Sequence, residues 1–133
     1  MTWFVDTSAL FAVLDADDRN HAAAQRAWRA ALESGEALLT SSYVVVETSA
    51  LVQQRLGLVA LRTLCNDVLP VLQIHWVLEE EHQAATAALL AAARRKLSLV
   101  DCVSFQLMRR RGVAQALAFD RHFREEGFTS PVG

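Results

Sequence analysis

Short apolar runs alternate with segments of helical spacing along the whole 133-residue chain. Three of the runs are mostly continuous rather than alternating, as in strands that are buried on both faces of a sheet. The expected strands cover residues 2–5, 37–39, 71–76 and 116–119, and a weaker fifth lies near Phe128. Strands that alternate with helices predict an α/β fold, with a central parallel sheet of four to five strands and helices on both faces.

The helical segments are bounded by residues that commonly end helices. The expected helices cover residues 21–33, 42–56, 58–69, 79–95 and 99–111. Gly35, Gly57, Pro70 and Gly112 stand at the ends of four of them, where a left-handed residue or a missing N–H stops a helix. No Pro-, Gly- or Ser-rich linker divides the chain, so residues 1–133 are expected to form one domain.

Charge and hydropathy exclude several classes of protein. The formal net charge is −2, which rules out a globally basic nucleic-acid coat, so contact with nucleic acid would need a local patch or a metal. Neither a secretory signal pattern nor a membrane-length apolar run is visible, and the protein is expected to be cytoplasmic, without membrane contact. Cys65 and Cys102 fit neither a disulfide framework nor a zinc site, and are expected to be buried.

Four carboxylates are predicted to meet at one edge of the sheet. Asp6 ends the first expected strand and Asp120 the fourth, and ligands of open parallel sheets bind beyond the carboxyl ends of the strands. Asp101 lies in the first turn of an expected helix. Glu47 lies in the second turn of the helix that follows the second strand. Four separate elements thus bring an acid to the same end of the fold.

Each acid also has a structural explanation. Asp6 and Asp120 are placed to cap the helices that follow them, and Ser98 with Asp101 has the spacing of a capping box. Capping therefore remains an alternative for three of the four. Glu47 lies within an apolar helical run, where a carboxylate either reaches solvent or needs a partner.

Taken together, the four acids favour a cation site. Carboxylates crowded at one point raise each other's pKa unless a positive charge sits among them. An all-oxygen ligand set favours a hard ion such as Mg²⁺ or Mn²⁺ over zinc. Such ions hold phosphate oxygens and activate water, so the residues indicate phosphoryl or phosphodiester transfer.

The four segments that carry these acids resemble the motifs of PIN-domain nucleases, above all the VapC toxins of bacterial toxin–antitoxin pairs. The resemblance rests on FVDTSAL at residues 4–10, VVE at 45–47, LSLVDCVSF at 97–105 and ALAFDRHF at 116–123. The motifs follow in family order over essentially the whole chain. The resemblance implies a three-layer PIN-like fold and a metal-dependent endoribonuclease that leaves 5′-phosphate and 3′-hydroxyl ends.

The resemblance assigns roles residue by residue. The acids matching the family's catalytic, metal-binding set, which holds one or two Mg²⁺ or Mn²⁺ ions, are Asp6, Glu47, Asp101 and Asp120. Thr7 or Ser8 matches a hydroxyl beside the first acid, and Ser98 matches a serine before the third, more plausibly a cap than a ligand. Many family members have Thr where this chain has Ala118, so a hydroxyl beside Asp120 is missing, but no acid is lost.

Basic residues near the acids are candidates for RNA binding. The candidate residues are Arg94, Arg95, Lys96, Arg109, Arg110, Arg121 and His122. The two basic runs among them are expected to end two helices, and the competing explanation is that they complement the helix dipoles and keep the surface soluble. For His122, contact with RNA or phosphate competes with a half-exposed position in the first turn of a helix.

Several partners and alternative functions remain open. The family resemblance implies an RNA substrate, a homodimer and an antitoxin, and the leucine-rich segment 56–69 is the candidate contact helix unless it packs into the core. The first hypothesis is an endoribonuclease toxin, and the second is a non-catalytic PIN-fold module that binds RNA or protein. A phosphoacceptor receiver domain is disfavoured, because the only lysine, Lys96, precedes the last helix–strand pair.

Overall fold

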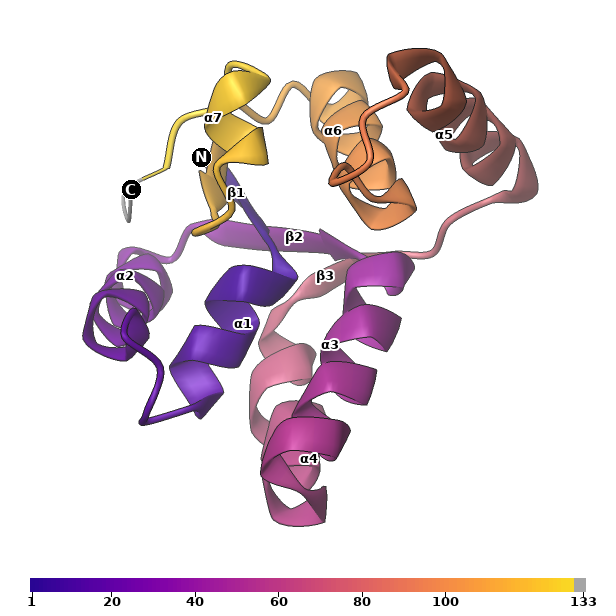
Figure 1. Ribbon diagram of the computed structural model, residues 1–133. Coiled ribbons are helices and arrows are strands. Elements are labelled where there is room, and N and C mark those ends of the chain that lie inside the picture. Colours follow the sequence, from indigo (N-terminus) through magenta and orange to yellow (C-terminus); the bar gives the residue numbers. More distant parts are fainter. Residues whose placement is uncertain (131–133) are drawn as a thin grey trace.

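The computed structural model describes residues 1–130, and the last three residues of the expected single domain lie outside the described part. Four parallel strands form one sheet in the order β3-β2-β1-β4 (Figure 1). The strands are β1 (Thr2–Val5), β2 (Ala37–Ser41), β3 (Gln73–His75) and β4 (Gln115–Leu117). The predicted α/β class with a parallel sheet is confirmed.

Helices cover both faces of this sheet (Figure 1). On one side lie α1 (Thr7–Leu14), α2 (His21–Ser34), α3 (Ser42–Leu56) and α4 (Leu58–Thr63). On the other side lie α5 (Glu79–Ala92), α6 (Leu99–Arg111) and α7 (His122–Glu125). The chain therefore forms three layers.

The strand order reverses direction between β1 and β4. From β1 the chain steps outward to β2 and then β3, and it later returns to the opposite side of β1 as β4. At such a point the chain leaves the carboxyl ends of the two neighbouring strands toward opposite faces of the sheet. A crevice opens between the two connections, and ligands of α/β sheets bind there. Asp6 and Asp120 follow these two strands directly or within a few residues.

A cluster of phenylalanines fixes the elements around this crevice. Phe123 of α7 is fully buried, and its ring lies 5.0 Å from that of Phe105 in α6 and 6.2 Å from that of Phe4 in β1. Phe128 stacks on Phe105 at 5.8 Å. Burying each ring contributes roughly 1.5–3 kcal/mol, so a helix as short as α7 is held by packing rather than by its own hydrogen bonds.

Some predicted boundaries match and others are wrong. The strand at 2–5 and the helices at 42–56 and 99–111 have the expected limits. The helix predicted over 58–69 instead ends at Thr63, and the chain goes on as a π-helical turn (Leu64–Val68) and a 3₁₀ turn (Leu69–Val71). Pro70 stands in this last turn, where it has no N–H to extend a helix. This 3₁₀ turn also shortens the strand predicted over 71–76.

Three smaller expectations are also corrected. The predicted fifth strand is reduced to an isolated bridge between Gln115 and Thr129. The helix predicted to reach residue 95 ends at Ala92, because Ala93 adopts a left-handed conformation with φ of 53°. Cys65 is exposed on the π-helical turn, whereas Cys102 is buried as expected.

Candidate active site

One pocket at the carboxyl edge of the sheet brings together the four acids named from the sequence. They come from the end of β1, from α3, from α6 and from the loop after β4. The residues that line this pocket, called here the acidic pocket, are Asp6, Thr7, Ser8, Glu47, Leu51, Lys96, Ser98, Asp101 and Asp120. The convergence expected from the strand ends is therefore present.

Asp6 is the most deeply buried acid of this pocket, with 5% of its surface exposed. It caps α1, and its Oδ2 accepts hydrogen bonds from the Ser8 hydroxyl at 2.7 Å and the Ser8 backbone N–H at 3.2 Å. Burial raises the pKa of Asp6 to about 7, and repulsion from Asp101 and Asp120 acts in the same direction, against the two Ser8 hydrogen bonds. A positive charge placed here would relieve both causes.

Buried hydroxyl groups hold the strand end that carries Asp6. The Thr40 hydroxyl donates to the Val5 carbonyl at 2.8 Å, which ties β2 to the last residue of β1. The Thr48 hydroxyl of α3 donates to the Thr7 hydroxyl of α1 at 3.0 Å, and both threonines are buried. These bonds fix α3, which carries Glu47, against the turn that carries Asp6.

Asp101 both caps a helix and faces the pocket. Its backbone N–H donates to the Ser98 hydroxyl at 3.0 Å, and its Oδ2 accepts from the Ser98 backbone N–H at 3.1 Å. This reciprocal pair is the capping box expected from the sequence. Burial raises the pKa of Asp101, and repulsion from Asp120 adds to the rise while the Ser98 hydrogen bonds oppose it. Capping and membership of the pocket therefore coexist.

Glu47 reaches solvent, the simpler of the two outcomes expected for it. The residue is exposed on α3 and lines the pocket one helical turn before Leu51. Within residues 1–130 its carboxylate makes no ion pair with a basic side chain, so its oxygens remain available to a ligand. Leu51 supplies an apolar wall beside it.

Asp120 is joined to His122 rather than to an arginine. Its Oδ1 accepts the backbone N–H of His122 at 2.9 Å, and the imidazole Nδ1 of His122 lies 2.8 Å from the same oxygen. The expectation of a half-exposed histidine is wrong, because His122 is buried with 7% of its surface exposed. A buried ring of this kind does not present itself to an RNA backbone.

The basic residues are arranged unevenly around the acids. Lys96 lines the acidic pocket itself. Arg94 and Arg121 both pair with Glu125, at 2.7 and 3.5 Å, while Arg95 is exposed in the turn after α5. The run expected to end the helix over 79–95 therefore lies beyond it, because α5 stops at Ala92.

The second basic run lies at the far end of α6. Arg110 pairs with Glu81, and Arg109 lies over the Phe128 ring and 3.9 Å from Glu126. Arg110 is nine residues beyond Asp101, about 14 Å along the helix axis at 1.5 Å per residue. Both arginines therefore have carboxylate neighbours that do not belong to the acidic pocket.

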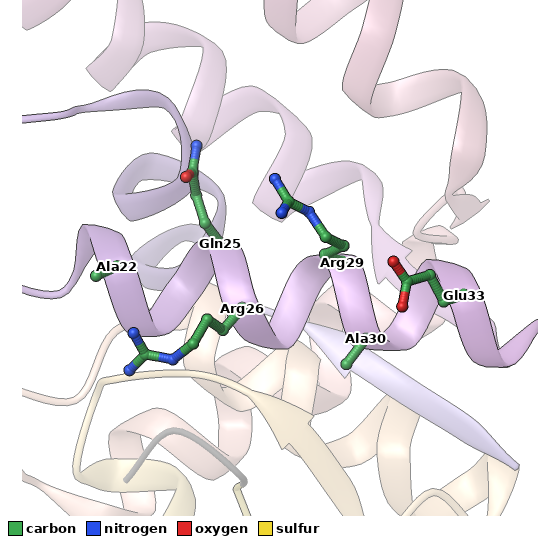
Figure 2. Close-up of a pocket in the computed structure, with 6 residues that line it drawn as sticks. All are labelled: Ala22, Gln25, Arg26, Arg29, Ala30 and Glu33. Atoms are coloured by element: carbon green, nitrogen blue, oxygen red, sulfur yellow. The ribbon is translucent and has the colours of Figure 1, made fainter.

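Another hollow follows the outer side of α2 (Figure 2). Its lining comes from this one helix, and the Arg26 and Arg29 side chains extend to opposite sides of it. Glu33 is the only carboxylate among these lining residues. The hollow beside α2 therefore lacks the converging acids that line the acidic pocket. The acidic pocket is the candidate active site.

Sequence reasoning missed residues that support the pocket and one residue, Leu51, that lines it. Thr40 and Thr48 are the supporting residues concerned, and Thr48 directly follows Glu47 in a mostly apolar stretch of helix. A hydroxyl at such a position needs a partner when buried, and that requirement is a signal. Leu51 could have been found from its spacing, because residues four apart in a helix are neighbours.

Comparison with known proteins places the chain. The family model described as "PIN domain" matches residues 3–128. The 23S rRNA-specific endonuclease VapC20 of Mycobacterium tuberculosis, from strains CDC 1551 and H37Rv, is 32% identical over 126 residues that cover 94% of each chain. The crystal structure of M. tuberculosis VapC20, a sarcin-ricin loop cleaving toxin, aligns with a TM-score of 0.84 at 31% identity, and the alignment covers 97% of both chains. The chain therefore belongs to the PIN-domain family, as its four motifs predicted.

Proposed function

We propose that this protein is a metal-dependent endoribonuclease of the VapC-like toxin class, which hydrolyses RNA phosphodiester bonds in the acidic pocket. The observation that carries the proposal is the convergence of Asp6, Glu47, Asp101 and Asp120 on one pocket in a chain of the PIN-domain family. The similarity to VapC20 over nearly the whole of both chains favours catalysis over a purely structural role.

The donor set of the pocket fits a divalent cation. Burial and like-charge repulsion raise the pKa of Asp6 to about 7, and burial raises that of Asp101, so a cation bound among these carboxylates would be favourable. Carboxylate oxygens are the ligands of Mg²⁺ and Mn²⁺ in proteins, and we assign these acids to hold one or two such ions. When bound, the ion supplies Lewis-acid chemistry and lowers the pKa of a water that attacks phosphorus.

The residues of the chain would contribute orientation and charge. Ser8 fixes one oxygen of Asp6, and Ser98 fixes one oxygen of Asp101, so both carboxylates are held before substrate arrives. Lys96 on the pocket wall places a positive charge where an RNA phosphate would enter. Glu47, which lines the pocket and is exposed to solvent, would join Asp6 and Asp101 in holding the ion.

The finer features of the proposal concern substrate and partners. We assign ribosomal RNA as the substrate class to test first, because VapC20 is a 23S rRNA-specific endonuclease. The toxin class implies an antitoxin, a homodimer and a cytoplasmic site of action, with residues 1–133 as one domain. Within residues 1–130, no helix is long and apolar enough to span a membrane.

The proposed dimer contact requires one change to the segment named from the sequence. Leu58 and Val59 of α4 are 64% and 78% exposed, which suits a contact surface, whereas Leu64 is fully buried in the core. The contact would therefore involve only the exposed side of residues 56–69.

A direct test combines RNA with the metal. Wild type, Asp101→Asn and Asp67→Asn are incubated with ribosomal RNA and with short looped RNAs in Mn²⁺ or Mg²⁺, and the new ends are mapped. Asp67 is an exposed acid outside the pocket, so its variant is the matched control. The expected result is cleavage by wild type and Asp67→Asn, with 5′-phosphate and 3′-hydroxyl products, and loss of most activity in Asp101→Asn.

Two outcomes would contradict the proposal. Cleavage by Asp101→Asn at the wild-type rate would show that the acidic pocket takes no part in catalysis. RNA that is bound by wild type but stays intact in both metals would favour the alternative, a non-catalytic PIN-fold module.

A further inference from the structure

We infer that His122 is itself a metal ligand, and that Asp101, Asp120 and His122 form a mixed nitrogen and oxygen position that prefers a divalent transition-metal ion to Mg²⁺. The inference rests on the proposed function and deepens it, because it concerns the metal chosen by the same pocket. It also replaces the RNA-binding role considered for His122 from the sequence.

The first observation is a buried nitrogen without a hydrogen bond. The His122 side chain is 9% exposed, and its Nδ1 finds no aligned hydrogen-bond partner among the described residues. The nitrogen lies 2.8 Å from Oδ1 of Asp120, but off the line that a hydrogen bond requires. A buried polar atom of this kind is uncommon, because leaving it unpaired costs roughly 1–3 kcal/mol.

The second observation is the spacing of the three donor atoms. The His122 Nδ1 is 2.8 Å from Oδ1 of Asp120 and 3.8 Å from Oδ2 of Asp101, and one ligand atom from each residue lies within 4.8 Å of the others. Two atoms that bind one ion at about 2.1 Å are at most about 4.2 Å apart. Both distances from Nδ1 meet that limit.

The imidazole is held in this place by the core and by the turn that it shares with Asp120. Phe123, the next residue, is fully buried against Phe105 and Phe4. The His122 backbone N–H is bonded to Asp120 at 2.9 Å, so the ring and the carboxylate share one rigid turn. A donor set fixed before the ion arrives is typical of a metal site.

The ligand types decide the class of metal. Imidazole nitrogen is a good ligand for first-row transition metals, whereas Mg²⁺ prefers oxygen and water. Adding one nitrogen to two carboxylates therefore shifts preference from Mg²⁺ toward ions such as Mn²⁺ and Co²⁺. The all-oxygen set expected from the sequence would make no such distinction.

The test is a pulsed electron paramagnetic resonance measurement on protein loaded with Mn²⁺, without RNA. A coordinated imidazole produces ¹⁴N modulation of the Mn²⁺ echo, and we expect it in wild type and in the control His21→Asn. His122→Asn, which keeps a polar group near the Nδ1 position, should lose the modulation. It should also bind Mn²⁺ at least about tenfold more weakly, while Mg²⁺ binding changes by much less.

The outcomes separate this inference from the proposed function. Mn²⁺ bound in wild type without ¹⁴N modulation overturns the role of His122, even where the His122 variant fails to fold, and leaves the nuclease proposal intact. Equal weakening of Mn²⁺ and Mg²⁺ in His122→Asn would make the histidine a structural residue. The absence of any Mn²⁺ binding overturns the inference, and the RNA cleavage assay then decides the function separately.

Discussion

The Ser8 hydroxyl lies 2.9 Å from the backbone nitrogen of Phe119, which is 111 residues further along the chain, and accepts its hydrogen bond. The same hydroxyl donates to Asp6 at 2.7 Å. One serine thus connects the turn after β1 to the segment after β4, the two strand ends that open the crevice. The relative position of Asp6 and Asp120 depends on this bridge.

Removing the hydroxyl should therefore destabilise the protein and disturb the pocket. Ser8→Ala leaves the Phe119 N–H without its acceptor, and we expect a loss of about 1–3 kcal/mol in the free energy of unfolding. Urea denaturation measures this loss. Ser49→Ala, which removes a hydroxyl bonded only within α3 at 2.7 Å to Val45, is the control and should change stability by less than about 0.5 kcal/mol. Equal effects of the two variants would contradict the bridging role.

The Thr7–Thr48 hydroxyl pair should show strong coupling. Thr7→Val or Thr48→Val alone leaves one buried hydroxyl unpaired and should cost about 1–3 kcal/mol. The double variant removes both hydroxyls and should cost less than the sum of the two single changes, which a double-mutant cycle measures. Strict additivity would mean that the 3.0 Å contact contributes nothing to holding α3 on α1.

The raised pKa of Asp6 predicts how the stability of the metal-free protein depends on pH. Its value of about 7 exceeds the 3.8 of an unperturbed Asp, so folding favours the protonated form. The contribution is fully present below pH 3.8 and is lost as pH rises toward 7, because the unfolded chain releases the proton first. Between pH 5 and pH 8 the loss should be about 3 kcal/mol.

Asp6→Asn removes this contribution, so the comparison isolates it from other titrating groups. Urea denaturation of both proteins in a chelator, at pH 5 and pH 8, gives the difference directly. Wild type should lose stability relative to the variant at the higher pH. A constant difference across this interval would contradict the buried, carboxylate-crowded environment of Asp6.

Much of the fold could be predicted because local signals agreed with the tertiary structure. The apolar run of β1, the Ser98–Asp101 capping box and the glycine at 112 each have a local physical cause, and all appear as expected. The four acids could be named because they follow strand ends or open helices, where topology gathers them.

The remaining features depend on long-range packing that no local pattern encodes. The burial of His122 follows from the contacts of Phe123 with rings that lie far away in the sequence. The pairing of Arg110 with Glu81 depends on the packing of α5 against α6. For the same reason, a basic run that resembled an RNA-binding patch proved to have carboxylate neighbours.

Lys96 and Arg110 should differ in their contribution to RNA binding. The measurements use a catalytically inactive background such as Asp101→Asn, so that RNA is bound but not cleaved. In this background Lys96→Ala should weaken RNA binding. It should also reduce the steepness of log affinity against log salt by about 0.7, the value for one phosphate contact on a single strand. Arg110→Ala should leave the slope nearly unchanged and should instead reduce the stability of the protein, because the ion pair with Glu81 is lost. A salt slope that falls only in Arg110→Ala would reverse this assignment.

The central claim is that the acidic pocket holds a divalent cation, and thermal unfolding during a metal titration tests it most directly. Wild type and Asp6→Asn are unfolded over a series of Mn²⁺ and Mg²⁺ concentrations. Binding to the folded state should raise stability by about 2.7 kcal/mol at a hundredfold excess over the dissociation constant. We predict a metal-dependent rise in wild type that is lost in Asp6→Asn; an equal rise in both proteins, or none in wild type at millimolar metal, would contradict the claim.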